Sequence, residues 1–105
     1  MLDYRFLTMR AKRLLEQNHV RITDHVLFDH PERQIEVSNI YFCLRVGSIA
    51  GLEPRKVLGL VKYGGLNRYR WYGEDGSGHV LRLILVFDRD LIVVSAAVAN
   101  TKQRG

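Results

Sequence analysis

The sequence predicts an α+β domain in which N-terminal helices pack on a C-terminal antiparallel β-sheet. Apolar residues recur at helical spacing before Gly47, and after it they alternate or run together as they do in strands. Two turn signals then divide the second half into antiparallel segments. The 105 residues suffice for one domain with a single modest core, and residues 100–105 are expected to form a frayed tail. Helices followed by a meander of strands are typical of two packed layers.

Three helices are expected in the first half. In residues 3–18 the apolar side chains fall on one helical face and basic side chains occupy the others. A short extended link at 20–23 leads to a brief second helix, which Thr23 or Asp24 caps and His30-Pro31 interrupts.

The third helix is expected at residues 36–46, with Gly47 as its stop. The spacing of its apolar residues predicts which side chains are buried. This stripe consists of Val37, Ile40, Tyr41 and Leu44.

The second half is expected to be stranded. Residues 48–52 and 66–73 are predicted strands, and between them Pro54 opens a helical turn that Gly64-Gly65 ends. Residues 74–78 form a strong turn signal. The segments 79–87 and 91–99 are apolar on both faces, which is typical of central strands, and the short turn at 88–90 makes them a hairpin.

The chain's excess positive charge is concentrated in residues 54–73. This window holds five cations and no acid, so the 11 cations outside it equal the 11 acids in number. The cations are Arg55, Lys56, Lys62, Arg68 and Arg70, and the aromatic rings among them are Tyr63, Tyr69, Trp71 and Tyr72. Cations neutralise phosphates and flat rings stack on unpaired bases, so the pattern predicts a surface for single-stranded nucleic acid. A solvated hairpin whose rings pack on the core is the alternative.

Several other classes find little support. Cys43 is the only cysteine, which excludes an internal disulfide and fits a reducing cytoplasm, and its place near an apolar stripe favours core packing over nucleophilic catalysis. The N-terminus is too charged for a signal peptide, and no apolar run approaches the length of a bilayer span, so no membrane partner is expected. No glycine-rich phosphate loop and no convincing metal-ligand spacing is present, so neither a cofactor nor a metal is predicted.

Arg82 supplies a geometric argument for a phosphate site. A cation in a strand otherwise built for burial needs a partner, either an acid such as Glu53 or the phosphate of a ligand. One register of the hairpin places Tyr69 and Trp71 beside Arg82, and a slip by one residue places Arg68, Arg70 and Tyr72 there instead. The preferred phosphate-side group is Arg70, Arg82 and His79, with Tyr72 as a proton donor.

His25 and Arg33 have two interpretations each. Asp29 lies one helical turn after His25, so its carboxylate could orient the imidazole, or the two could form a surface pair without chemistry. Arg33 could clamp a phosphate or bridge Asp29 or Glu36. His19 and His30 lack such support and are interpreted as bystanders.

The order of helices followed by a basic antiparallel sheet resembles the RelE/ParE-like superfamily of small bacterial toxins. Residues 25–35 (HVLFDHPERQI) and the strands within 80–94 are similar to a branch of unknown function, marked by a His, an Arg eight residues on and an Ile two further. The run GHVLRLILVFDRDLIVVS also resembles the end of MqsR-type RNA interferases, and Lys56 falls near a proposed functional Lys of that group. Their Lys after the last strand and their middle-strand Gln have no counterpart here.

The resemblance, which spans about residues 12–98, implies a RelE-like two-layer fold that binds RNA and cleaves it without a metal, with an acidic antitoxin as protein partner. The expected catalytic residues are His25, Tyr72, His79 and Arg82; the expected RNA-binding residues are Arg33, Lys56, Lys62, Arg68, Tyr69, Arg70 and Trp71. Binding without cleavage, and a non-enzymatic module whose basic groove holds an acidic protein segment, remain alternatives. The oligomeric state, a homodimer included, is left open.

Overall fold

The computed structural model describes residues 4–28, 35–53 and 66–99, and it confirms the α+β class. The elements run in the order α1 (Tyr4–Glu16), β1 (Val20–Ile22), α2 (Asp24–Phe28), α3 (Val37–Val46), β2 (Ser48–Glu53), β3 (Arg68–Glu74), β4 (Val80–Phe87) and β5 (Leu91–Val98). The expected helical turn within 54–65, the interruption at His30-Pro31 and the tail at 100–105 lie outside the described residues. Within the described ranges, no helix is long and apolar enough to cross a membrane.

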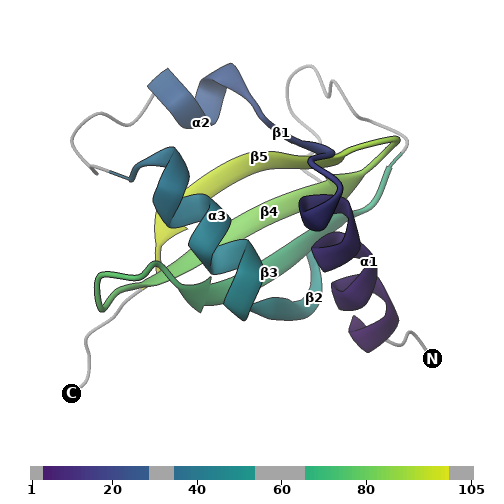
Figure 1. The fold of residues 1–105 in the computed structure, drawn as a ribbon, viewed down its shortest axis with the longest axis horizontal. Helices are drawn as coiled ribbons and strands as arrows, with labels where there is room; N and C mark the ends of the chain where they lie inside the picture. Colours follow the sequence, from purple (N-terminus) through teal and green to yellow (C-terminus); the bar gives the residue numbers. More distant parts are fainter. Residues whose placement is uncertain (1–3, 29–34, 54–65, 100–105) are drawn as a thin grey trace.

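The five strands form one sheet in the order β1-β5-β4-β3-β2 (Figure 1). Strands β2 to β5 are an antiparallel meander, as expected. The extended link is itself a strand, because β1 pairs in parallel with β5 and places Val20 opposite Leu91. Backbone bonds continue the pairing on both sides, from Leu91 N to His19 O and from Thr23 N to Val93 O. The sheet therefore has a short parallel edge strand, after which α2 packs beside β5.

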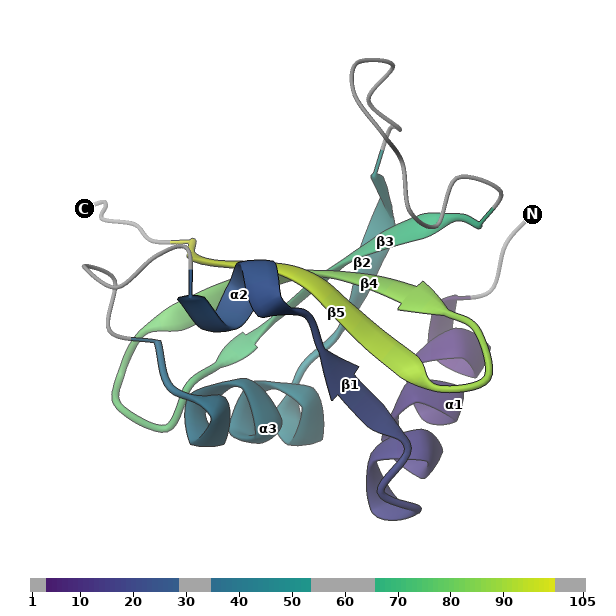
Figure 2. The same ribbon diagram turned by 90° about the horizontal axis from the view of Figure 1, so that it is seen from above.

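Helices α1 and α3 cover the same face of the sheet (Figure 2). Because successive strand residues point to opposite faces, every second side chain of β3 and β4 faces these helices. The helices contribute Ala11, Ile40, Cys43 and Leu44 to the core, and the middle strands contribute Tyr69, Trp71, Leu81, Leu83 and Leu85.

The predicted buried stripe of α3 is only half right. Ile40 and Leu44 are buried as expected, but Val37 is 39% exposed and Tyr41 is half-buried. Cys43 takes their place, with no exposed surface. Residues 40, 43 and 44 lie on one helical face, and this face is the one that meets the sheet.

Trp71 ties α3 to β3. Its side chain has no exposed surface, and its indole Nε1 donates a hydrogen bond of 2.9 Å to the carbonyl oxygen of Cys43. The N–H of Gly47, at the end of α3, donates to the same oxygen. Gly47 ends the helix as expected, but with φ −93° rather than a left-handed conformation. Glycine is required there by close approach, because an added Cβ would collide with Tyr72 O and lie 2.5 Å from Trp71 Nε1.

Candidate nucleic-acid interface

The register of the β3–β4 hairpin places basic and aromatic side chains together on the sheet face opposite α1 and α3. Tyr72 pairs with Arg82, and Arg70 pairs with Ile84. Of the two registers that the sequence left open, the structure has the one that brings Arg68, Arg70 and Tyr72 to the face of Arg82. We call these four side chains the arginine face.

Two guanidinium groups of the arginine face carry unsatisfied donors. The Nε atoms of Arg68 and Arg70 are buried and have no hydrogen-bond partner among the described residues. Glu53 lies on the same face, and its Oε1 is 3.6 Å from Nε of Arg70, which is an ion pair but too long for a hydrogen bond. A buried donor without an acceptor costs about 1–3 kcal/mol, and more when it is charged. Both side chains are still partly exposed, so an anion at this surface could contact the accessible parts of their guanidinium groups.

Gly51 makes room for one of these groups. It lies opposite Arg70 in β2, and a Cβ built on it would be 3.1 Å from a terminal guanidinium nitrogen of Arg70. The Arg70 side chain therefore lies across Gly51 at close range.

Arg82 stands at the exposed end of this face. Its side chain is exposed and Tyr72 is 36% exposed, whereas Ile84 and Val86 further along β4 are buried. Because Arg82 reaches solvent, it does not need the buried partner that the sequence suggested, and Glu53 pairs with Arg70 instead. The acids on this face of the described sheet are Glu53 and, at its end, Glu74.

Tyr69 and Trp71 face the opposite way. Trp71 is fully buried under α3, and Tyr69 is 8% exposed, with its ring edge-on to Tyr4 and Phe87 at centroid distances of 6.5 and 5.8 Å. The expectation that these two rings stack on bases does not fit their burial. For them the alternative interpretation, rings packed on the core, describes the structure, and Tyr72 is the ring of β3 that reaches the surface.

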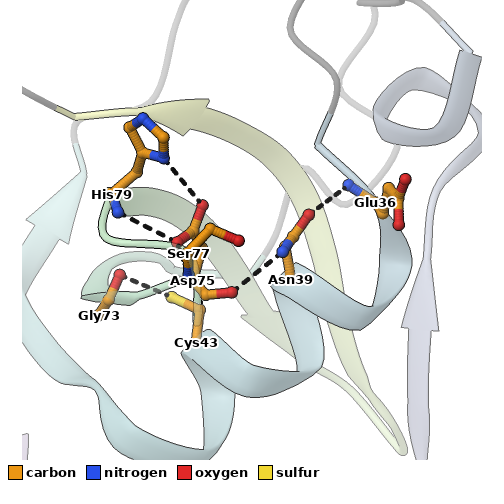
Figure 3. A network of polar contacts seen from close by, with 7 residues as sticks. All are labelled: Glu36, Asn39, Cys43, Gly73, Asp75, Ser77 and His79. Carbon is orange, nitrogen blue, oxygen red and sulfur yellow. Dashed lines mark hydrogen bonds and ion pairs between the residues drawn. The ribbon is translucent and has the colours of Figure 1, made fainter.

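His79 is held by the turn between β3 and β4 (Figure 3). The carboxylate of Asp75 accepts hydrogen bonds from the N–H groups of Ser77 and His79 at 2.7 and 3.1 Å, and its other oxygen is 3.6 Å from Nδ1 of His79. Asn39 of α3 donates to the carbonyl oxygen of Asp75 at 3.0 Å, so this network belongs to the helix side.

His79 precedes β4, and its bonds to Asp75, which is itself bonded to Asn39 of α3, hold it on the helix side of the sheet, away from Arg82. The expected group of Arg70, Arg82 and His79 is therefore divided: the two arginines share a face, and the imidazole does not join them. Asp75 was not among the predicted site residues, although an Asp within a glycine-rich turn is a typical acceptor for nearby backbone N–H groups.

The remaining predicted site residues lie elsewhere. His25 is an exposed residue of α2, which packs beside β5, and two strand spacings, about 10 Å, separate β5 from β3 and Tyr72. Arg33, Lys56 and Lys62 lie outside the described residues, as does Asp29. The described part of the chain contains no group of three or more metal-ligating side chains.

One polar cluster was not anticipated. Nδ1 of His19 is 3.2 Å from Asp90, and Nε of Arg21 is 3.6 Å from the same carboxylate. The cluster joins β1 to the β4–β5 turn, so His19, interpreted as a bystander, helps to hold the edge strand in place.

No protein-family model matches the chain, and comparisons with curated proteins and with solved structures give no match either. The resemblance to RelE/ParE-like toxins therefore stays a prediction.

Proposed function

We propose that the protein binds single-stranded RNA on the arginine face, in the cytoplasm. The observation that carries this proposal is the placement of the partly exposed Arg68 and Arg70 on one sheet face with the exposed Tyr72 and Arg82. Phosphate oxygens are strong acceptors for guanidinium groups, so an RNA backbone could bind the exposed parts of these arginine side chains.

The arrangement of the ring favours nucleic acid over an acidic protein segment. Tyr72 has Arg82 directly across from it in β4 and Arg70 two residues away in β3, which is about 7 Å along the strand. An RNA strand that crosses the sheet here could place phosphates on both cations and a base on the ring between them. A peptide carboxylate would use the cations but would leave the ring without a role.

The described site supports binding more directly than cleavage. Tyr72 and Arg82 are neighbours and could serve as a proton donor and a stabiliser of negative charge. Metal-free cleavage also needs a base beside the attacking 2′-hydroxyl, and neither His79 nor His25 lies on the arginine face. The proposal is therefore confined to binding.

Replacing Arg70 and Arg82 together by Gln should weaken RNA binding and reduce its dependence on salt. Each lost phosphate contact should lower the slope of log affinity against log salt by about 0.7, or about 1.4 for the pair. Fluorescence anisotropy of a labelled 12-nucleotide oligouridylate, titrated at several salt concentrations, measures both quantities.

The matched control is the Arg13→Gln and Arg89→Gln pair, which removes the same charge from exposed positions on α1 and in the β4–β5 turn. An affinity that ignores salt, or an equal loss in the control pair, would contradict a specific RNA site. Displacement of the RNA by an equimolar polyglutamate peptide would favour the protein-binding alternative instead.

A further inference from the structure

A shallow hollow adjoins the end of the arginine face, where α3 ends and β3 and β4 begin to turn. Its walls include two aromatic rings, two valines and two polar side chains, namely Phe42, Tyr72, Val46, Val80, Ser48 and Glu74. Val46 is 51% exposed and Val80 is 41% exposed. Large apolar side chains that remain exposed around one hollow are typical of a binding site.

The hollow continues the arginine face through a shared residue. Tyr72 belongs to both, and Glu74 and Val80, which pair with each other across β3 and β4, lie on the same face of the sheet as Arg82. Phe42 and Val46 belong to α3 on the other face, so the hollow wraps around the edge of β3 where β2 has not yet begun to pair with it. A strand of RNA held by Arg70 and Arg82 would therefore pass the mouth of the hollow.

The chemistry of the hollow suits a base and not a phosphate. A carboxylate repels phosphate, so Glu74 marks a position where the backbone of the RNA does not lie. The rings and valines offer apolar surface to a flat heteroaromatic group. Glu74 accepts hydrogen bonds through two oxygens and donates none when it is ionised, so the preferred base presents two adjacent donors.

We propose that this hollow takes a guanine base of the bound RNA, with Glu74 accepting from its Watson–Crick edge. This inference rests on the proposed function. Guanine presents N1–H and the N2 amino group side by side, which matches the two carboxylate oxygens. Adenine and cytosine each present one amino group beside a ring acceptor, and uracil presents one N–H between two carbonyl oxygens. With each of these bases, one carboxylate oxygen of Glu74 would lack a donor or would face another acceptor.

The test compares three eight-nucleotide RNAs: oligouridylate, the same chain with one central guanosine, and the same chain with inosine in its place. Inosine keeps N1–H but lacks the N2 amino group. We expect the guanosine RNA to bind about tenfold more tightly than oligouridylate, with inosine between them. In Glu74→Gln the ratio of the guanosine and uridine affinities should fall to near one, whereas Glu16→Gln, which removes an exposed acid from α1, should keep it.

A second readout locates the base. In methyl NMR spectra the signals of Val46 and Val80 should shift with the guanosine RNA and much less with oligouridylate. Salt-dependent binding of all three RNAs with equal affinity, or a guanosine preference that survives in Glu74→Gln, overturns the guanine site and leaves the arginine face intact. If none of the three RNAs binds, the proposed function itself fails.

Discussion

Gly47→Ala should lower the free energy of unfolding by about 3 kcal/mol or more. The added Cβ would collide with the carbonyl oxygen of Tyr72 and lie 2.5 Å from Nε1 of Trp71 and 2.8 Å from the carbonyl oxygen of Cys43. Two of these atoms are backbone, so the strand and the helix must separate. Overpacking of this kind costs about 1–3 kcal/mol, and loss of the buried Trp71 hydrogen bond adds a similar amount. Urea denaturation followed by far-UV circular dichroism measures the change.

The matched control is Gly51→Ala, which makes the same substitution a few residues later in the chain. Its Cβ would meet a single atom, the terminal guanidinium nitrogen of Arg70 at 3.1 Å, which belongs to the flexible end of a side chain. We expect Gly51→Ala to cost less than about 1 kcal/mol, since the guanidinium can move. If the two variants lose similar stability, the close packing of α3 against β3 at Gly47 is not the reason for this glycine.

The helices and strands could be predicted because their apolar side chains recur at clear helical or strand spacing. The apolar runs of β4 and β5, and the turn at 88–90 between them, fix a hairpin without reference to the rest of the molecule. The parallel pairing of β1 could not be predicted in the same way. It joins Val20 to Leu91, and three residues carry too little pattern to select a partner so distant in the sequence.

The residues that share the arginine face depend on the register of β3 against β4, and the sequence left two registers open. Large rings and arginines alternate along β3, so one face must take Tyr69 and Trp71 and the other must take Arg68 and Arg70. Burying the rings is favourable, and burying unpaired guanidinium groups is not, so this energy difference selects the observed face for each set. The charge and burial preferences of the side chains together could have decided the register. Composition alone assigned the rings and the arginines of β3 to one nucleic-acid surface.

The position of His79 could not be deduced from alternation alone. Asp75 fixes it through bonds within a turn in which Gly76 and Gly78 adopt φ values of 87° and 95°. Such a left-handed conformation is favoured by glycine, and the sequence signals a turn here but does not specify which backbone groups its Asp will bind. An imidazole beside such a turn is therefore placed by local hydrogen bonds and not by the strand pattern.

Cys43 should react with iodoacetamide at pH 8 at least about a thousandfold more slowly in the native protein than in the unfolded chain. Burial is the main cause that raises the pKa of its thiol from an ordinary 9.0 to about 12; the Trp71 side chain lowers the pKa and the charge of Asp75 raises it. At pH 8 this shift reduces the reactive thiolate from about one-tenth to about one ten-thousandth of the population. The thiol also has no exposed surface and donates a hydrogen bond of 3.4 Å to Gly73 O (Figure 3). Because Cys43 is the only cysteine, mass spectrometry of the intact chain follows the reaction directly.

The same shift predicts how stability depends on pH. Between pH 9 and about 12 the unfolded thiol has lost its proton and the folded thiol has kept it, so the contribution of Cys43 to stability falls as pH rises through this window. Cys43→Ala should remove that contribution and flatten the decline of stability with pH relative to the wild type.

Gly47→Ala, if it folds, should speed alkylation of Cys43 at pH 8, because labelling then proceeds through opening of the packed core. Fast labelling of the native protein at a rate that Gly47→Ala leaves unchanged would mean that reagent reaches Cys43 without opening the contact between α3 and β3.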